Sequence, residues 1–395
     1  MGRVLQNREN RFGFVGDNMT EQKRLGDIAT YINGFAFKPE NRGTAGLPII
    51  RIQDLTGNAY DLGFYDGSYP KRIEINDGDV LISWSASLGV YIWNRGKALL
   101  NQHIFKVAFD KCEVNREYFV YAVRHKLKEM ESKTHGATMK HIVKKDFDNT
   151  LIPFPTLSEQ GKIAELLDTA ATIISARQSQ LQKLDELVKA RFVEMFGIYP
   201  ANPKGWETGT IRDVVSDVRY GSSRPAVDGG KYPYLRMNNI TYGGELDLSD
   251  TKRIDIPDNE LDKCTVRRGD VLFNRTNSKE LVGKTCVYNR DDMMVLAGFV
   301  IRVRVSERIL PEFLSEFLNT EFSKQMLLAM CKTAIGQANI NAQEMQNIDL
   351  YLPPIELQRK FVQFKEQTDK SKAAVQKALD EAQMLFDSLM QKYFG

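Results

Sequence analysis

The sequence contains few residues that usually bind metals or form disulfides. It has four cysteines and four histidines in 395 residues, and no two cysteines are spaced as a CxxC pair. This spacing predicts neither a zinc site nor a redox dithiol. We therefore expect free thiols in a reducing cytoplasm and no bound metal.

Long uncharged apolar runs are also missing. None reaches the roughly 18 residues that a transmembrane helix needs. Residues 1–20 mix charges without an apolar signal-peptide core, so we expect an N-terminal tail there and no membrane partner. The net charge is only +3, which indicates a nucleic-acid partner only if the basic residues cluster.

Motifs of the common catalytic classes are absent as well. The sequence has no GxxxxGK[ST] phosphate loop, no serine in a GxSxG context and no Asn/Asp-Pro-Pro-aromatic motif. The nearest segment to the last, 352–355, is Leu-Pro-Pro-Ile and lacks both the amide and the aromatic ring. We expect no catalytic activity in this polypeptide.

What the sequence does contain is a long internal repeat. The chain is 42% hydrophobic and 27% charged, as in an ordinary globular protein, and its length predicts two domains. Five segments recur in the same order: 47–57 as 232–244, 77–83 as 268–274, 88–96 as 282–290, 103–109 as 299–305, and 152–167 as 350–364. We infer a tandem duplication with a period of about 190 residues.

Each copy shows the same order of expected elements. Short β-rich segments punctuated by Gly, Asp and Asn come first and predict strands. In the first copy they cover 47–53, 79–83, 88–93 and 103–109. A helix follows at 116–130 or 311–330, and then a polar loop around Gly136 or Gly336. A Pro-bounded segment finally introduces a long helix, over 157–196 or 355–393.

The two long helices carry apolar residues at alternating spacings of four and three. The series includes Ile163, Leu167 and Ala170 in the first helix, and Phe361 and Phe364 in the second. Sustained over four or more heptads, this pattern favours a coiled coil, and a domain between the helices makes it antiparallel. The alternative is that each helix packs only on its own domain, which the polar positions in the series would support: Arg177, Arg191, Thr368 and Ser371.

This order of elements resembles the specificity subunit of type I restriction-modification systems. The resemblance is carried by the Pro-bounded helix starts at 152–160 and 353–358, the two Gly-Asp-Val-Leu segments, and the stretches 24–28 and 203–206. It extends from about residue 21 to the C-terminus. The second copy departs in having Leu357-Gln358 where the first has Glu159-Gln160, and the first copy has no match to Trp206.

The resemblance implies an α+β fold: two β-rich target recognition domains in tandem repeat, separated by two long helices that form an antiparallel coiled coil. The expected segments are a tail (1–20), recognition domain 1 (21–156), spacer helix 1 (157–200), recognition domain 2 (201–354) and spacer helix 2 (355–395).

It also implies a non-catalytic subunit that binds a split target in double-stranded DNA, one half-site per domain. The implied partners are two modification subunits, which methylate adenine at N6, and restriction (translocase) subunits. S-adenosylmethionine, ATP and Mg would bind those partners, so no cofactor is expected on this chain. An interpretation from another class is a non-catalytic scaffold whose twin domains bind protein or glycan. DNA binding that weakens with salt would distinguish the two.

The loops after the Gly-Asp-Val-Leu segments are the first candidates for DNA contact. Specific recognition needs cations at phosphates and planar or bidentate side chains at base edges. The candidates are Ser83, Trp84, Ser85 and Ser87 in the first copy, and Asn274, Arg275, Asn277 and Lys279 in the second. Arg275 could span guanine O6 and N7, and Asn277 could pair with adenine. A solvated turn explains any single one of these residues equally well.

The glycine loops are the second candidates, because glycine permits close backbone approach. They contribute Thr138, Lys140, His141 and Lys144 in the first copy, and Gln337 and Asn339 in the second. The lysines could neutralise phosphates, although a charged helix face would explain them almost as well.

A third set is Arg51 and Gln53, matched by Arg236 and Asn238. Alternation would place each pair on one face of a strand. Since the arginines are shared by both copies, they suit a shared task such as structural ion pairing or phosphate contact. The polar turn with Tyr220, Ser222 and Arg224 is a further candidate of the same kind.

Overall fold

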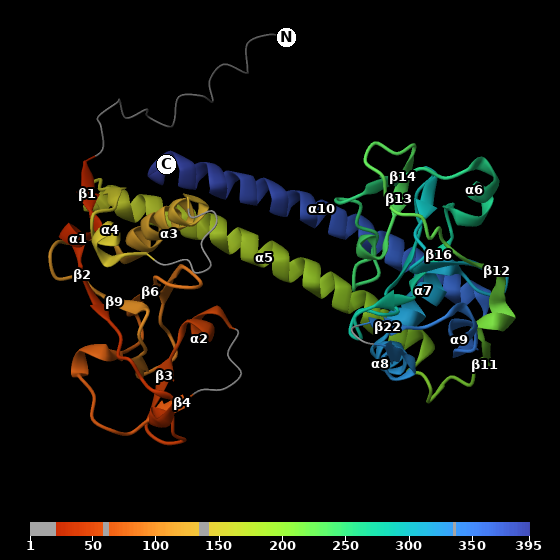
Figure 1. Ribbon diagram of the computed structural model, residues 1–395, viewed down its shortest axis with the longest axis horizontal. Helices are drawn as coiled ribbons and strands as arrows, with labels where there is room; N and C mark the ends of the chain where they lie inside the picture. Colours follow the sequence, from red (N-terminus) through yellow and green to blue (C-terminus); the bar gives the residue numbers. More distant parts are fainter. Residues whose placement is uncertain (1–20, 58–62, 134–141, 335–336) are drawn as a thin grey trace, which may run out of the picture. The chain divides into compact units, whose positions relative to one another are not determined.

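The computed structural model describes residues 21–57, 63–133, 142–334 and 337–395. The chain forms two compact units (Figure 1). Unit 1 comprises the described residues up to Arg177 together with Ala378–Gly395, and unit 2 comprises Gln178–Lys377. Both long helices, α5 (Leu157–Phe196) and α10 (Ile355–Phe394), therefore contribute one part to each unit. Their bounds agree with the expected ones, apart from one more residue at the end of α10.

Unit 1 is built on two four-stranded sheets and one strand pair. The first sheet is antiparallel, in the order β2 (Thr30–Asn33), β9 (Ile104–Ala108), β6 (Val80–Ser83), β7 (Gly89–Ile92). The second is β4 (Gly63–Tyr65), β3 (Leu47–Ile50), β8 (Ala98–Leu100), β5 (Glu74–Ile75), in which β3 and β8 are parallel. β1 (Gln22–Arg24) pairs with β10 (Leu151–Pro153) just before α5 begins.

Unit 2 repeats this topology strand for strand. Its sheets are β12 (Val215–Tyr220), β20 (Val300–Val305), β16 (Val271–Asn274), β18 (Thr285–Val287), and β14 (Lys252–Ile254), β13 (Tyr232–Leu235), β19 (Met294–Leu296), β15 (Thr265–Val266). β11 (Glu207–Thr210) pairs with β23 (Asp349–Leu352). The described part of unit 2 also holds a small sheet, β17 (Thr276–Asn277), β22 (Gln337–Asn339), β21 (Lys332–Ala334). The duplication inferred from the sequence is therefore a duplication of the fold.

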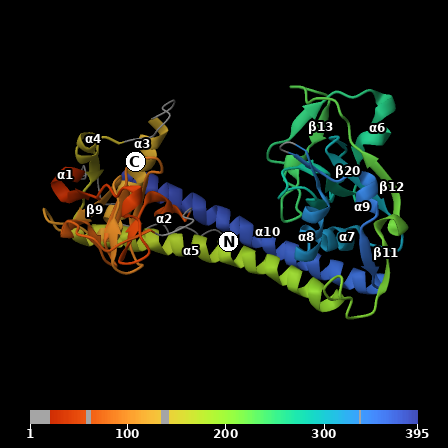
Figure 2. The same cartoon turned by 60° about the horizontal axis from the view of Figure 1, so that its bottom comes forward.

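In each unit a helical layer lies between a sheet and the long helices (Figure 2). Unit 1 uses α3 (Arg116–Lys133), which contacts β7. Unit 2 uses α7 (Pro311–Asn319) and α8 (Glu321–Met330). The expected single helix over 311–330 is wrong. Thr320 is extended and its hydroxyl accepts a hydrogen bond from the Ser323 N–H, so it ends one helix and caps the next.

Short helices complete the described units. They are α1 (Leu25–Ile28), α2 (Ile52–Thr56), α4 (Lys144–Asp148), α6 (Asp258–Cys264), α9 (Ala342–Gln346) and 3-10 turns at Pro39–Asn41, Lys71–Ile73, Ile211–Val214 and Met237–Asn239.

The expected antiparallel pairing of the long helices is confirmed within each unit. In unit 1, Leu167 near the start of α5 shares a buried core with Phe394 at the end of α10. In unit 2, Phe192 near the end of α5 lies 5.2 Å from Phe361 near the start of α10, between ring centroids. The same cores include residues of α3 and α7, so each helix also packs on the unit that it helps to form.

One glutamine in each copy ties the start of a long helix to the preceding helical layer. Gln160 is fully buried; its Oε1 accepts from the Asn115 N–H at 2.9 Å and its Nε2 donates to the Pro155 carbonyl at 2.9 Å. Gln358 does the same with the Leu310 N–H and the Pro353 carbonyl, both at 2.8 Å. The glutamine of the Pro-bounded motif therefore has a structural role in both copies, because its side chain hydrogen-bonds to backbone groups in the interior.

The Gly-Asp-Val-Leu segments have a structural role as well. Each forms a turn and leads into a strand, β6 or β16. Gly78 and Gly269 have φ of +88° and +89°, a conformation that favours glycine. Asp79 accepts from Lys106 Nζ at 2.8 Å, and Asp270 accepts from Arg304 Nε at 2.8 Å. These segments therefore hold the strands that lead into the candidate loops.

Candidate nucleic-acid interface

Two of the candidate loops meet at the end of β16 in unit 2. Arg275 follows this strand; its N–H donates to the Phe299 carbonyl at 2.9 Å, and its carbonyl accepts from the Ile340 N–H at 2.9 Å. The next two residues form β17, in which Thr276 pairs with Asn339 and Asn277 with Ala338 of β22. The loop after β16 and the second glycine loop, predicted separately, thus form one surface.

Tyr220 holds the Arg275 side chain on this surface. The guanidinium carbon lies 4.8 Å from the centroid of the Tyr220 ring, which is 43% exposed. The Tyr220 hydroxyl in turn accepts from the Ala342 N–H at 2.9 Å, so the ring is fixed by the backbone. In the described part of the chain, Arg275 Nε has no hydrogen-bond partner and the guanidinium forms no ion pair with a carboxylate. This half-buried arginine is therefore oriented by stacking, with its Nε enclosed and no carboxylate to neutralise its charge.

The other candidates of this surface differ in how far they are exposed. Lys279 is exposed, and Asn277 and Asn339 are half-buried. Asn277 Oδ1 accepts from the Ser278 N–H at 2.9 Å, whereas Asn339 Oδ1 is enclosed without a partner among the described residues. Asn274 is fully buried and donates to the Leu281 carbonyl at 3.3 Å, so its side chain supports the loop from inside. The backbone of Gln337 belongs to β22, but its side chain lies outside the description.

Trp84 occupies the equivalent position in unit 1. Its N–H donates to the His103 carbonyl at 3.2 Å, and its carbonyl accepts from the Ile142 N–H at 3.0 Å, as Arg275 does with Phe299 and Ile340. The indole stacks on Phe105 with 5.5 Å between ring centroids. The two copies thus present different side chains from the same backbone frame.

The serines beside Trp84 close its loop. Ser83 is fully buried and its hydroxyl donates to the Ser87 carbonyl at 2.6 Å. Ser85 is 8% exposed, and Ser87 is exposed. Ser83 and Ser85 therefore shape this loop rather than project from it.

The first glycine loop contributes one described candidate. Thr138, Lys140 and His141 lie outside the described residues. Lys144 begins α4; its Nζ lies 2.7 Å from Asp148 Oδ2 and 5.7 Å from the centroid of the Tyr31 ring. Lys144 thus forms an ion pair with a carboxylate one helical turn away.

The expected strand face for Arg51 and Gln53, and for Arg236 and Asn238, is wrong. Strand β3 ends at Ile50, because the Asp54 carboxylate accepts from the Arg51 N–H at 2.8 Å and turns the chain into α2. Asn239 Oδ1 accepts from the Arg236 N–H at 2.8 Å and starts a 3-10 turn in the same way. Gln53 and Asn238 are exposed on these short helices.

The arginines and the serine of the remaining candidates are bound to other groups of the chain. Arg51 is 6% exposed and its Nε lies 3.0 Å from Asp54, and Arg236 lies 2.8 Å from Asp250, as structural ion pairing requires. Arg224 lies 2.7 Å from Glu260. Ser222 is 5% exposed, and its backbone bonds to Leu296 and Gly298. Contact with DNA stays a prediction for every candidate residue.

A group of lysines in unit 2 was not predicted from the sequence. Lys324 of α8 lies 4.8 Å from the centroid of the Tyr242 ring, and its Nζ is enclosed without a hydrogen-bond partner among the described residues. Burial, together with the nearby charges of Lys284 and Lys189, lowers the pKa of this amine to about 8. No sequence signal marks the group, because its members come from three distant segments.

Replacing Lys324 with methionine is expected to raise the free energy of unfolding at pH 7 by roughly 1–3 kcal/mol. Below about pH 8 the native state holds a charged, enclosed amine that the unfolded chain would solvate. Between about pH 8 and 10.5 the unfolded state binds more protons than the native state. Wild-type stability therefore rises with pH in this window, and the advantage of the variant fades.

Urea unfolding at pH 6 to 10.5 measures this difference. Lys263→Met, at an exposed position of α6, is the control and should change stability little at any pH. An advantage of the Lys324 variant that does not vary with pH would contradict the assignment.

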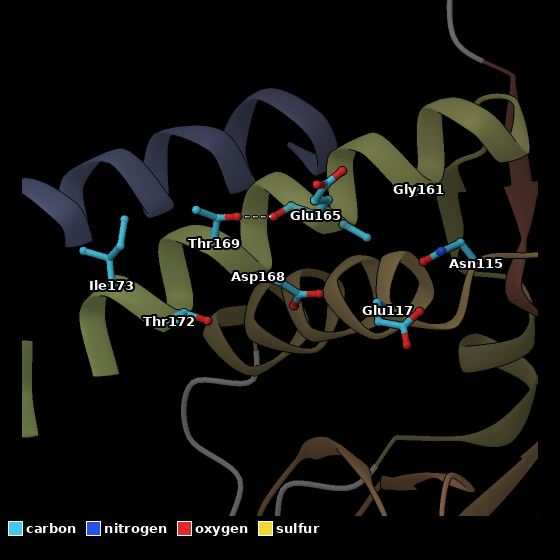
Figure 3. A pocket seen from close by; sticks show the side chains of 9 residues that line it. Asn115, Glu117, Gly161, Glu165, Asp168, Thr169, Thr172 and Ile173 are labelled. Carbon is cyan, nitrogen blue, oxygen red and sulfur yellow. Dashed lines mark hydrogen bonds between the residues drawn. The ribbon is translucent and has the colours of Figure 1, made fainter. Parts of the chain in front are cut away.

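Two grooves lie in the helical layers and are not lined by the candidate loops. In unit 1 a groove of about 500 Å³ runs between the start of α3 and α5 (Figure 3). In unit 2 a groove of about 760 Å³ lies between α7 and α10. Glu117 and Asp168 of the first correspond to Glu312 and Glu366 of the second. The grooves thus repeat with the duplication, and they do not mark the candidate DNA surface.

Two other kinds of site are absent from the described part of the chain. It contains no group of three or more His, Cys, Asp or Glu side chains placed to hold a metal ion. None of its helices combines the length and the apolar character needed to cross a membrane.

Comparisons with known proteins agree with the duplicated architecture. The family model of the type I restriction modification DNA specificity domain matches residues 18–186 and 203–382. The EcoBI specificity subunit of Escherichia coli is 25% identical over 94% of this chain and 84% of its own length. The EcoKI specificity subunit of Escherichia coli strain K12 is 25% identical over 93% and 86%.

A solved structure has the same fold. The S subunit of a type I restriction-modification system from M. genitalium superposes with a TM-score of 0.56 at 15% identity, covering 96% of this chain and 97% of the other. The matches to the family model cover most of both halves of the sequence. The chain therefore belongs to the type I restriction modification DNA specificity domain family, and it carries two copies of that domain.

Proposed function

We propose that this chain is the DNA-binding specificity subunit of a type I restriction-modification complex. Unit 1 and unit 2 each recognise one half of a split target in double-stranded DNA. The chain itself is non-catalytic and acts in the cytoplasm. It docks two modification subunits, with restriction subunits joining, and S-adenosylmethionine, ATP and Mg bind those partners.

The observation that supports this function best is the placement of Arg275. Its guanidinium stacks on Tyr220 without a carboxylate partner in the described chain, whereas Arg51, Arg224 and Arg236 are paired with acids. An oriented arginine without an acidic partner suits the O6 and N7 acceptors of guanine, or a phosphate. Since Trp84 takes its place in unit 1, the two units suit two different half-sites.

The surface of the long helices supports the docking of partner subunits. In unit 1, Leu166 and Ile173 of α5 are 42% and 45% exposed. Met384 and Leu385 of α10 are 64% and 56% exposed. Large apolar side chains at this exposure on regular helices are typical of protein interaction surfaces when they gather.

Replacing Arg275 with alanine is expected to weaken binding at one half-site only. A base contact of this kind contributes about 1–3 kcal/mol, which is roughly a 5- to 150-fold change in affinity. The measurement is a titration of labelled duplex DNA with the assembled complex at several salt concentrations. Arg268→Ala is the matched control, because Arg268 is exposed and lies 2.7 Å from Asp291.

Wild-type binding should weaken steeply with salt, as phosphate contacts require. Equal losses for Arg275→Ala and Arg268→Ala would contradict the role of Arg275. Wild-type protein that does not bind DNA at any salt concentration would favour the scaffold interpretation instead.

A further inference from the structure

His103 and Phe299 occupy the same position in the two copies, next to the candidate loops. Each is the residue before the first residue of the central strand, β9 (Ile104–Ala108) or β20 (Val300–Val305). Each gives its carbonyl to the N–H of the loop residue, Trp84 at 3.2 Å or Arg275 at 2.9 Å. Neither residue was a candidate in the sequence, and the structure places both on the proposed DNA surface.

Matching backbone hydrogen bonds hold this position in both units. The residue before it donates its N–H across to the neighbouring segment: Gln102 to the Phe35 carbonyl at 2.9 Å, and Gly298 to the Ser222 carbonyl at 2.7 Å. The turn that carries the side chain is therefore held from both sides. A side chain on such a frame is positioned before any ligand arrives.

The side chains at this position are not part of the buried cores. Phe299 is 51% exposed, although the next residues along the strand, Val300 and Ile301, are fully buried. His103 is half-buried, with its ring centroid 4.9 Å from that of Trp84. Its Nδ1 is enclosed and has no hydrogen-bond partner among the described residues. An exposed phenyl ring and a half-buried imidazole thus flank the two loops.

The backbone of unit 1 is also unusual here. His103 has φ of +73° and Ala86, in the loop of Trp84, has φ of +58°. Only three non-glycine residues of the described chain have a positive φ, and these two flank Trp84. Such conformations persist where the surrounding structure enforces them, and they gather at functional sites.

We propose that His103 and Phe299 are specificity-determining residues that contact DNA bases, one in each half-site. Phe299 packs its ring against a thymine methyl group or a base step beside the contact of Arg275. His103 hydrogen-bonds a base edge beside Trp84. The proposal rests on the proposed function, because it assumes that each unit binds one half-site. It adds a position at which the two copies carry side chains of different chemistry while the backbone hydrogen bonds around it are the same.

The test compares selected DNA sequences for variants of the full chain, assembled with its modification subunits. The variants are His103→Phe and Phe299→His, which exchange the two chemistries, and Phe299→Ala. The probe is a duplex oligonucleotide library with two randomised half-sites. Ile92→Ala in unit 1 and Met293→Ala in unit 2 are controls, because both residues are 46% exposed but lie outside the two loops.

We expect each variant to change the base preference at one or two positions of its own half-site by tenfold or more, and to leave the other half-site unchanged. Both controls should select the wild-type sequence. Variants that bind with the wild-type preference in both half-sites would overturn the assignment of this position. A change in both half-sites from one variant would overturn it too. If the wild-type complex selects no sequence at all, the proposed function itself fails, which is a distinguishable result.

Discussion

Replacing Phe394 with alanine is expected to lower the free energy of unfolding of unit 1 by about 3–5 kcal/mol. Phe394 is fully buried, and its ring centroid lies 5.2 Å from that of Tyr118 and 6.2 Å from that of His125. Removing the ring leaves a cavity between α3 and the end of α10, which cannot collapse while both helices are held by the rest of the core. A residue next to the C-terminus has this large effect because unit 1 combines the first part of the chain with the end of α10.

Denaturant unfolding measures this effect, with Met384→Ala as the matched control on the same helix. Met384 is 64% exposed, so its truncation should change stability by less than about 0.5 kcal/mol. Equal, small effects of both variants would show that the end of α10 is not part of the unit 1 core.

Replacing Arg302 with methionine is expected to destabilise unit 2 by roughly 2–4 kcal/mol. The side chain is 1% exposed, and it donates to Asp217 Oδ2 at 2.7 Å and to the Thr265 carbonyl at 2.5 Å. Its loss removes the donor to the part-buried Thr265 carbonyl and one cation from Asp217. Because Arg302 lies in β20, three residues after Phe299, the variant should also weaken binding at the half-site of unit 2.

Lys106→Met in unit 1 is the matched control for this prediction. Lys106 pairs with Leu81 in the same register as Arg302 with Leu272, and it donates to the Glu74 carbonyl and to Asp79, both at 2.8 Å. Its side chain is 19% exposed, so we expect a smaller loss of about 1–2 kcal/mol, confined to unit 1. Equal losses of unfolding free energy at both positions would contradict the claim that the deeper burial of Arg302 makes its replacement more destabilising.

The long helices could be predicted from the sequence because their signals are local. Four-three spacing of apolar residues and the Pro-bounded segments before Leu157 and Ile355 placed α5 and α10 to within a residue. The repeat itself predicted that both halves share one fold. The glutamine in each helix start was visible, but its buried partners at Asn115 and Leu310 lie about 45 residues away and carry no pattern.

The misplaced elements depend on single side chains that hydrogen-bond the backbone. Thr320 breaks an apolar segment that otherwise predicts one helix, and Asp54 turns a strand pattern into a helix after Ile50. A Thr or Asp that can cap a helix is the signal at both positions. Alternation outweighs it at Asp54, and the match to the helix at 116–130 outweighs it at Thr320. The places of His103 and Phe299 beside the candidate loops, and the enclosure of Lys324, depend on tertiary neighbours, so no spacing along the chain predicts them.

The most direct test of the central claim is a genome-wide map of methylated adenines in cells that express this chain with its modification subunit. We expect a split motif that is methylated only when the chain is present, with one half changed by Arg275→Ala and the other unaffected. Assembly of the complex without any new methylated motif would contradict the claim that the two units recognise the two halves of a DNA target.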